Sequence, residues 1–196
     1  MRPRALRNRA PSRHDSPARS PVNLYFRLLL VLFGQRFRRG FDIHGTDNAI
    51  FRVTVGDIDV YGHMNNGRYL TIMDLGRLRW LRRTGIFDRT RAEGWAAVVA
   101  QQTVTYRRPL RVGQRFELRT RYLGSDDHGS YTEQIFVRRG NLHAHAVVRT
   151  KFLTRHDGPV VTDDLRALLD GDDLVVPGWV ADWSASARSA AADSPS

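Results

Sequence analysis

Apolar and polar residues alternate from Ala49 to Val55, as they do in a strand with one buried face. A longer run, from Tyr69 to Arg83, carries apolar residues at helical spacing on several of its sides. This pattern is typical of a helix that the rest of the fold encloses. Arg82, Arg83 and the following Gly85 are the residue types that end a helix, so we expect it to stop there.

Four extended runs follow the helix and are separated by polar or turn-forming residues. They cover Trp95 to Tyr106, Gln114 to Leu123, Ser130 to Arg138 and Leu142 to Leu153. One early helix followed by consecutive strands predicts an α+β domain, with an antiparallel sheet of about five strands wrapped around one central helix. We place this domain at residues 46–156.

The N-terminal segment differs from this region. Residues 1–21 are mainly Arg, Pro and Ser and are expected to be disordered, or to lie upstream of a true start at Val22. Residues 24–33 are strongly apolar but fall short of the roughly 20 residues that a membrane-spanning helix needs. We expect an apolar and basic helix within 22–45. Either it contacts an anionic membrane surface through 24–39, or it packs against the domain or a partner.

The C-terminal segment, residues 157–196, is rich in aspartate. Asp163 to Leu169 is predicted to form a short helix that begins with Asp163 as its cap. Trp179 and Trp183 are candidates for docking on the domain. Residues 184–196 are small and polar and are expected to be disordered.

Composition narrows the chemistry. The chain has no cysteine, so disulfides, cysteine nucleophiles and thiolate metal sites are excluded. His143 and His145 lack further ligands at the usual spacing, and we predict no metal site. No G-x-S-x-G, phosphate-loop or G-x-G-x-x-G motif occurs. The net charge of +11 suits a phosphorylated ligand. It would also suit nucleic acid, but the sequence contains no recognisable nucleic-acid-binding motif, so we expect no nucleic-acid partner.

The segment from Gly56 to Tyr69 links the first strand to the helix. It contains Asp57, Asp59 and the adjacent pair Asn65 and Asn66. Either asparagine could cap the helix by accepting a bond from an unpaired N–H group. A carboxylate placed just before a helix N-terminus lies among unpaired backbone donors at the positive end of the dipole. We therefore expect this segment to carry the chemistry.

Eight residues of this segment match a known signature at fixed spacing: Gly56, Asp57, Asp59, Gly62, His63, Asn65, Asn66 and Tyr69. They resemble the turn of hot-dog-fold thioesterases of the 4-hydroxybenzoyl-CoA thioesterase type, and the resemblance covers roughly residues 48–156. It implies a hot-dog fold and an acyl-CoA substrate, with no cofactor beyond the coenzyme A of the substrate. It also implies a homodimer or a dimer of dimers, because hot-dog sites lie at subunit interfaces.

By the same resemblance, the catalytic carboxylate is Asp59. It could attack the thioester carbonyl or take a proton from water, and the sequence leaves both routes open. His63 would orient Asp59 or contact substrate, unless it only shapes the turn. Asn65 and Asn66 are expected to cap the helix and shape the loop. Tyr69 would line the acyl pocket or pack in the core.

Further supporting residues are predicted outside the turn. Asp74 on the central helix is a second carboxylate candidate, or else a partner for an arginine. Gln102 and Thr103 lie on the strand after the helix and could position water. Arg107 and Arg108, at the end of that strand, could bind coenzyme A phosphates or form a solvated basic rim.

The sequence thus predicts an acyl-CoA thioesterase. The alternative is a non-catalytic hot-dog module that binds acyl groups or scaffolds a membrane assembly. We expect a cytoplasmic protein, with peripheral contact to the inner face of a membrane as an open alternative. The identity of the acyl chain depends on pocket shape and cannot be read from the sequence.

Overall fold

The computed structural model describes residues 40–154, 158–160, 162–169 and 174–192. The predictions for residues 1–39, including the apolar run at 24–33, lie outside these ranges. In the described part, Gly40 to Thr46 is irregular chain that leads into the first strand.

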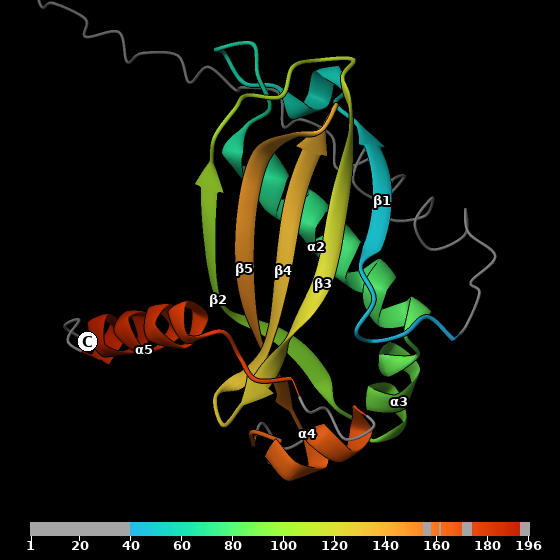
Figure 1. Ribbon diagram of the computed structural model, residues 1–196, viewed down its shortest axis with the longest axis vertical. Coiled ribbons are helices and arrows are strands. Elements are labelled where there is room, and N and C mark those ends of the chain that lie inside the picture. The colour runs from blue at the N-terminus through green and yellow to red at the C-terminus, as the bar shows by residue number, and fades with distance from the viewer. Residues whose placement is uncertain (1–39, 155–157, 161, 170–173, 193–196) are drawn as a thin grey trace, which may run out of the picture.

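Five antiparallel strands form one sheet, which confirms the predicted fold class (Figure 1). The strands are β1 (Asp47–Arg52), β2 (Ala96–Tyr106), β3 (Arg115–Asp126), β4 (Gly129–Arg138) and β5 (Asn141–Leu153), in the order β1-β3-β4-β5-β2. Chain neighbours β3, β4 and β5 pair directly because short turns join them. β2 lies beyond β5, at the edge of the sheet opposite β1, and the chain reaches it through the helices that follow β1.

The long helix α2 (Asn66–Arg83) crosses one face of the sheet, as Figure 1 shows. A single 3₁₀ turn, η1 (Val55–Asp57), precedes it. The other helices are α3 (Ile86–Ala92), α4 (Thr162–Leu168) and α5 (Gly178–Ala192). The sequence did not predict α3. The prediction of disorder from residue 184 is wrong for residues 184–192, because α5 includes them.

The main core lies between α2 and the sheet, where alternate residues of each strand face the helix. Its buried apolar members are Val53, Met64, Tyr69, Ile72, Met73, Leu110, Phe116, Leu118, Phe136, Ala144, Ala146 and Val148. Helix α2 therefore contributes residues from its first turn onward, and the packing that holds it also fixes the loop in front of it.

At Gly76, α2 lies in close contact with the sheet. A Cβ atom there would lie 2.5 Å from Leu118 Cδ2 and 3.0 Å from Gln134 Nε2. The fully buried Gln134 donates from Nε2 to the carbonyl oxygen of Met73, at 2.9 Å, and to Thr120 Oγ1, at 3.1 Å. Helix and sheet are thus joined by a hydrogen-bonded contact that leaves no room for a side chain.

A buried carboxylate ties β1 to the other end of α2. The Asp47 side chain is 1% exposed and lies 3.0 Å from Arg79 Nε. Arg83 donates to the other oxygen of the same carboxylate. Both arginines are on the C-terminal half of α2, so this ion cluster holds the edge strand against the helix.

The free edge of β2 is long and uncovered. β2 is the last strand in the sheet order, so along its 11 residues one side of the backbone pairs with β5. In the described part of the chain no strand pairs with its other side. Val98 and Val99 are exposed at 41% and 44%. Such an edge can pair with another strand.

Helix α5 lies on the sheet face opposite α2. Val180 packs with Leu123, Tyr131 and Val147, and the Tyr131 hydroxyl lies 2.9 Å from Ser184 Oγ. Figure 1 shows α5 extending away from the sheet beyond β2. Of the two tryptophans predicted to dock, Trp183 packs against this cluster. Trp179 is 51% exposed, and its ring lies 5.9 Å from that of His145. Among the described residues, no helix is both long and apolar enough to cross a bilayer.

Candidate active site

The loop between β1 and α2 is folded around Asp57. Its Oδ2 accepts from the Thr54 amide, at 2.7 Å, and from the Thr54 hydroxyl, at 2.8 Å. The Asp57 N–H donates back to the Thr54 carbonyl, at 3.0 Å. These bonds close the 3₁₀ turn as a capping box, and the Asp57 side chain is 2% exposed. Asp57 is therefore a structural carboxylate that shapes the loop.

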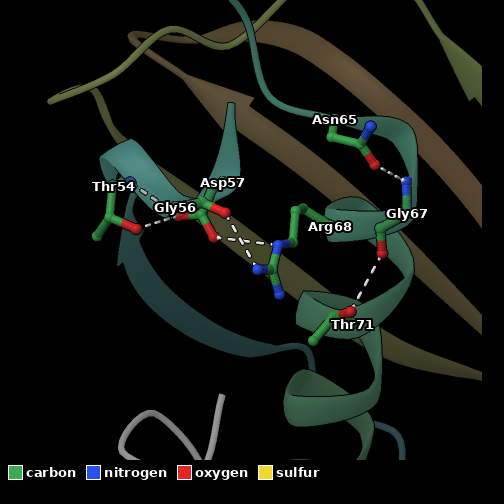
Figure 2. A network of polar contacts seen from close by, with 7 residues as sticks. All are labelled: Thr54, Gly56, Asp57, Asn65, Gly67, Arg68 and Thr71. Atoms are coloured by element: carbon green, nitrogen blue, oxygen red, sulfur yellow. Dashed lines mark hydrogen bonds and ion pairs between the residues drawn. The ribbon is translucent and has the colours of Figure 1, made fainter. Parts of the chain in front are cut away.

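Arg68, in the first turn of α2, links the helix to this turn (Figure 2). Its Nη2 donates to the Gly56 carbonyl, at 3.1 Å, and its Nε lies 3.9 Å from Asp57 Oδ1. The guanidinium is thereby anchored beside the loop. Arg68 was not among the residues predicted from the sequence. It could have been predicted from its position, three residues after the asparagine cap and in the first helical turn beyond the two aspartates.

Of the two asparagines predicted as possible helix caps, Asn65 is the one that caps α2. Its Oδ1 accepts from the Gly67 amide, at 2.9 Å, as Figure 2 shows. Its own N–H donates to the Asp57 carbonyl, at 2.8 Å, so the cap is joined to the loop. Asn66 is the first helical residue, and its carbonyl accepts from the Tyr106 hydroxyl, at 3.3 Å. The end of β2 is thereby attached to the start of α2.

Asp59 lies between these supports with its carboxylate partly open to solvent. One oxygen accepts from the Tyr61 amide, at 2.9 Å. The other is 3.7 Å from His63 Nδ1, which is beyond hydrogen-bond distance. The Asp59 side chain is 21% exposed. The turn thus orients the carboxylate through one oxygen and leaves the second oxygen available.

A pocket of about 350 Å³ adjoins Asp59. Its wall is formed by Gly56, Ile58, Asp59, Val60, Asn65 and Arg68. The structure therefore gathers the predicted carboxylate and the helix cap at one cavity and adds a cation to them. His63 does not line this cavity. Its carbonyl accepts from the Asp59 amide, at 3.0 Å, and its ring contacts the Asp59 carboxylate only at the distance given above.

The segment after β2 borders the same loop. The Met64 amide donates to the Leu110 carbonyl, at 2.7 Å, and His63 forms an isolated bridge with Arg111. Arg107 and Arg108 lie in this segment and are exposed. Arg108 also donates to the Asn141 side chain. The two predicted arginines are thus near the Asp59 loop, although they do not line its pocket.

The two predicted residues of β2, Gln102 and Thr103, face opposite sides of the sheet. Gln102 faces the side of the sheet that carries α2, together with Val104. Thr103 faces the opposite side, since it pairs with Val147 of the α5 cluster. The structure does not bring Thr103 to Asp59. A water-positioning role for Gln102 stays a prediction.

Tyr69 packs in the core. Its ring contacts those of Tyr106 and Phe136, with centroids 5.0 Å and 4.9 Å away. Burial raises the pKa of Tyr69 to about 12, against a smaller lowering by the backbone of Leu110. The phenol is therefore neutral at physiological pH. It supports the start of α2 from below, and the described pocket beside Asp59 does not include it.

A second cavity of about 350 Å³ lies between the C-terminal half of α2, α3 and the start of β2. Large apolar side chains dominate its lining: Leu78, Trp80, Leu81, Ile86, Phe87, Trp95, Val99, Tyr122, Phe152 and Leu169. We refer to it as the helix-side cavity. Sequence reasoning missed it because its wall combines segments far apart in the chain, including the unpredicted α3.

Asp74 is exposed at the edge of the helix-side cavity. It forms an ion pair with Arg77, whose other nitrogen donates to Gln134 Oε1, at 2.8 Å. Burial lowers the pKa of Arg77, and Asp74 opposes this effect. The structure therefore bears out the pairing of Asp74 with an arginine. Its use as a second catalytic carboxylate stays a prediction.

Comparison with known proteins gives consistent matches. A model of the thioesterase-like superfamily matches residues 53–183. Protein THEM6 of Drosophila melanogaster is 30% identical over 132 residues, which are 66% of this chain and 68% of that protein. Protein THEM6 of Danio rerio is 41% identical over 97 residues, or 50% of this chain, and the match spans about half of that relative (48%).

Solved thioesterase structures share the fold. The YbaW probable thioesterase from Escherichia coli matches with a TM-score of 0.60 and 22% identity, over 63% of this chain and 96% of that one. Slr0204, a 1,4-dihydroxy-2-naphthoyl-CoA thioesterase from Synechocystis, matches with a TM-score of 0.56 and 13% identity, over 67% of this chain and 100% of that one. These likenesses confirm the predicted hot-dog architecture.

Proposed function

Because the chain belongs to the thioesterase-like superfamily, we propose that it is an acyl-CoA thioesterase that uses Asp59 to hydrolyse the thioester. The products are a carboxylate and free coenzyme A. The observation that carries this proposal is the Asp59 carboxylate itself. It is oriented by the Tyr61 amide, retains an available oxygen, and borders a pocket at the N-terminus of α2.

This position suits both routes open to a carboxylate. As a nucleophile, Asp59 adds to the thioester carbon and expels coenzyme A as its thiolate, and water then hydrolyses the mixed anhydride to the product carboxylate and free Asp59. As a general base, it takes a proton from the attacking water. In either case negative charge develops on the thioester oxygen. Asn65 already accepts from the amides of Gly67 and Arg68, so the Asn66 N–H is the first-turn donor that we assign to this oxygen.

The open edge of β2 supports a site shared between two subunits. When two copies pair antiparallel through this edge, the Tyr106 end of one strand lies beside the Ala96 end of the other. The Tyr106 end is attached to the start of α2, beside the Asp59 loop. The Ala96 end forms part of the helix-side cavity. Pairing therefore brings the carboxylate of one subunit next to the helix-side cavity of its partner.

That cavity suits the acyl group. It is apolar, and its volume of about 350 Å³ is in the range of small-ligand sites. Arg107 and Arg108 extend from the same end of β2 as the Asp59 loop, where they can bind the phosphates of coenzyme A. The Synechocystis neighbour acts, by its name, on an aromatic acyl-CoA. We propose the same general class, an acyl-CoA, for this chain.

The test is hydrolysis of a panel of short, long and aromatic acyl-CoAs by wild type, Asp59→Asn and Asp74→Asn. We expect Asp59→Asn to lower kcat by about 10²–10⁴-fold while the melting temperature is kept. Asp74→Asn tests the second candidate carboxylate and should retain most of the activity if Asp59 alone carries the chemistry. The matched control is Asp127→Asn, which changes an exposed aspartate in the turn between β3 and β4 that lines neither cavity. Undiminished turnover in Asp59→Asn would reject its role, and no turnover of any acyl-CoA by wild type would favour the non-catalytic module.

A further inference from the structure

Few of the described residues pack against helix α5. Of its residues, Val180 and Ser184 are buried. From Ala185 to Ala192 the side chains are exposed or half-buried. A helix of about 15 residues is marginal in water when it has no packing partner. Because α5 is helical to Ala192, we expect its second half to pack against another surface.

The helix extends past the sheet on the side where the edge is open. Val180 packs with Val147 on β5, one strand in from β2. At about 1.5 Å per residue, the 12 steps from Val180 to Ala192 cover about 18 Å. The step from β5 to β2 is only about 4.8 Å. Because Figure 1 shows α5 running outward past β2, most of this length lies beyond the edge.

We infer that the second half of α5 lies across the outer sheet face of a second copy of this chain, joined through β2. The inference rests on the edge-paired dimer of the proposed function. A two-fold axis perpendicular to the sheet keeps the faces opposite α2 on the same side in both copies. Helix α5 lies on that face, so the strand that continues the sheet beneath it is the partner's β2.

The side chains on both surfaces fit close packing. Val180 and Ser184 define the stripe of α5 that faces its own sheet. At helical spacing this stripe continues through Ala187 and Ala191, which are small. On β2, the outer face carries Val98, which pairs across from Lys151 and is 41% exposed. The partner's α5 would cover this exposed apolar side chain.

The same face of β2 also carries Thr103 and Thr105, which pair with Val147 and His145. Both are small, and Thr105 is exposed. An alanine-rich helix can approach such a strand closely because neither surface presents a long side chain. The dimer contact would thus consist of two parts, the paired β2 edges and a helix from each copy across the other.

Cysteine cross-linking tests this arrangement directly, because the chain contains no cysteine of its own. The full chain is made with the pair Ala191→Cys and Val98→Cys, or Ala191→Cys and Thr103→Cys, and treated with a short bismaleimide. Two thiols held in one dimer react at an effective concentration of about millimolar. We therefore expect at least about tenfold more covalent dimer than from the control pair Ala191→Cys and Asn48→Cys, since Asn48 is exposed on the opposite edge strand.

A second measurement uses the dimer dissociation constant, obtained by light scattering over a dilution series. Ala187→Glu places a charge on the stripe that faces the partner, and we expect it to raise this constant by about tenfold or more. Ser189→Glu adds the same charge on the exposed side of α5 and should leave the constant unchanged. Equal constants for the two variants would overturn the inference.

The outcomes separate this inference from the enzyme assignment. Covalent monomer in place of dimer, or dimer no more abundant than in the Asn48→Cys control, would show that α5 does not cross the partner. A native dimer that hydrolyses acyl-CoA in that case keeps the proposed function. Specific cross-linking in a protein without hydrolysis would support the α5 contact and reject the enzyme. A monomeric protein would overturn both the contact and the shared site.

Discussion

Two inactive variants should restore turnover in one another if each site is built from two subunits. Asp59→Asn removes the carboxylate and keeps the helix-side cavity. Ala97→Trp keeps the carboxylate and fills much of that cavity, whose volume is about 350 Å³ and whose wall includes Ala97. In a mixed dimer, the carboxylate of the Trp variant then meets the open cavity of the Asn variant.

The expected magnitude follows from counting sites. When equal amounts of the two variants exchange subunits freely, about half of the dimers are mixed, and each mixed dimer has one intact site out of two. The mixture should therefore recover about a quarter of the wild-type activity. If carboxylate and cavity act within one subunit, no intact site forms and the mixture stays inactive.

The assay measures release of free coenzyme A with a thiol reagent, which the chain itself does not consume because it has no cysteine. Subunits are exchanged by dilution below the dissociation constant and reconcentration, and the dimer mass is checked afterwards. A control chain carrying both substitutions is mixed with an equal amount of wild type. A shared site predicts about a quarter of the full activity for that mixture, and a site within one subunit predicts about half.

The reasoning is refuted if the first mixture stays inactive while the second keeps half of the activity. That result would place carboxylate and acyl pocket in one subunit and would remove the support that the open β2 edge gives to the site. It would leave Asp59 itself untouched, because the single Asp59→Asn variant tests that residue separately.

Two further predictions concern buried charges. Asp47→Asn should destabilise the fold by about 2–4 kcal/mol, because it leaves two arginines without their buried counter-ion, and lower the melting temperature by about 4–16 °C. Glu117→Gln, which breaks an exposed pair on the neighbouring strand, should cost at most about 1 kcal/mol, and an equal loss in both would contradict this account. Burial alone would raise the pKa of Glu133, but hydrogen bonds from His145 and Arg121 outweigh it and hold that pKa below the usual 4.5. A depressed carboxyl pKa stabilises the fold above the unfolded value, so wild type should melt higher than Glu133→Gln at pH 7, and the two should converge as pH falls towards about 3.

The local geometry of the candidate site could be predicted from the sequence because it depends on local chemistry. The asparagine cap, the turn glycine and the spacing of Asp59 from the helix all act within a few residues. The strands were predicted to within a few residues for the same reason, since alternation is a local signal. Even the choice between Asn65 and Asn66, however, needed the backbone angles at the helix start.

The features that the sequence did not predict depend on contacts between segments far apart in the chain. Arg68 was not predicted, because its contact with the Gly56 carbonyl depends on the loop folding back against the helix. Helix α3 is short and carries Asp88, Arg89 and Arg91, so its few apolar residues gave no periodic signal. The part of α5 from residue 184 onward was interpreted as disordered because alanine and serine offer little apolar surface to bury. Its stability depends on the surface beneath it, which composition does not record.

The close packing of Gly76 against the sheet fixes the orientation of α2. Gly76 rests against Leu118, eleven residues from the asparagine cap at one end of α2, with the Asp47 ion cluster towards the other end. A side chain at position 76 would push α2 away from the sheet and shift its N-terminus. A substitution in the middle of the core would therefore displace the Asn65 cap and the loop that carries Asp59.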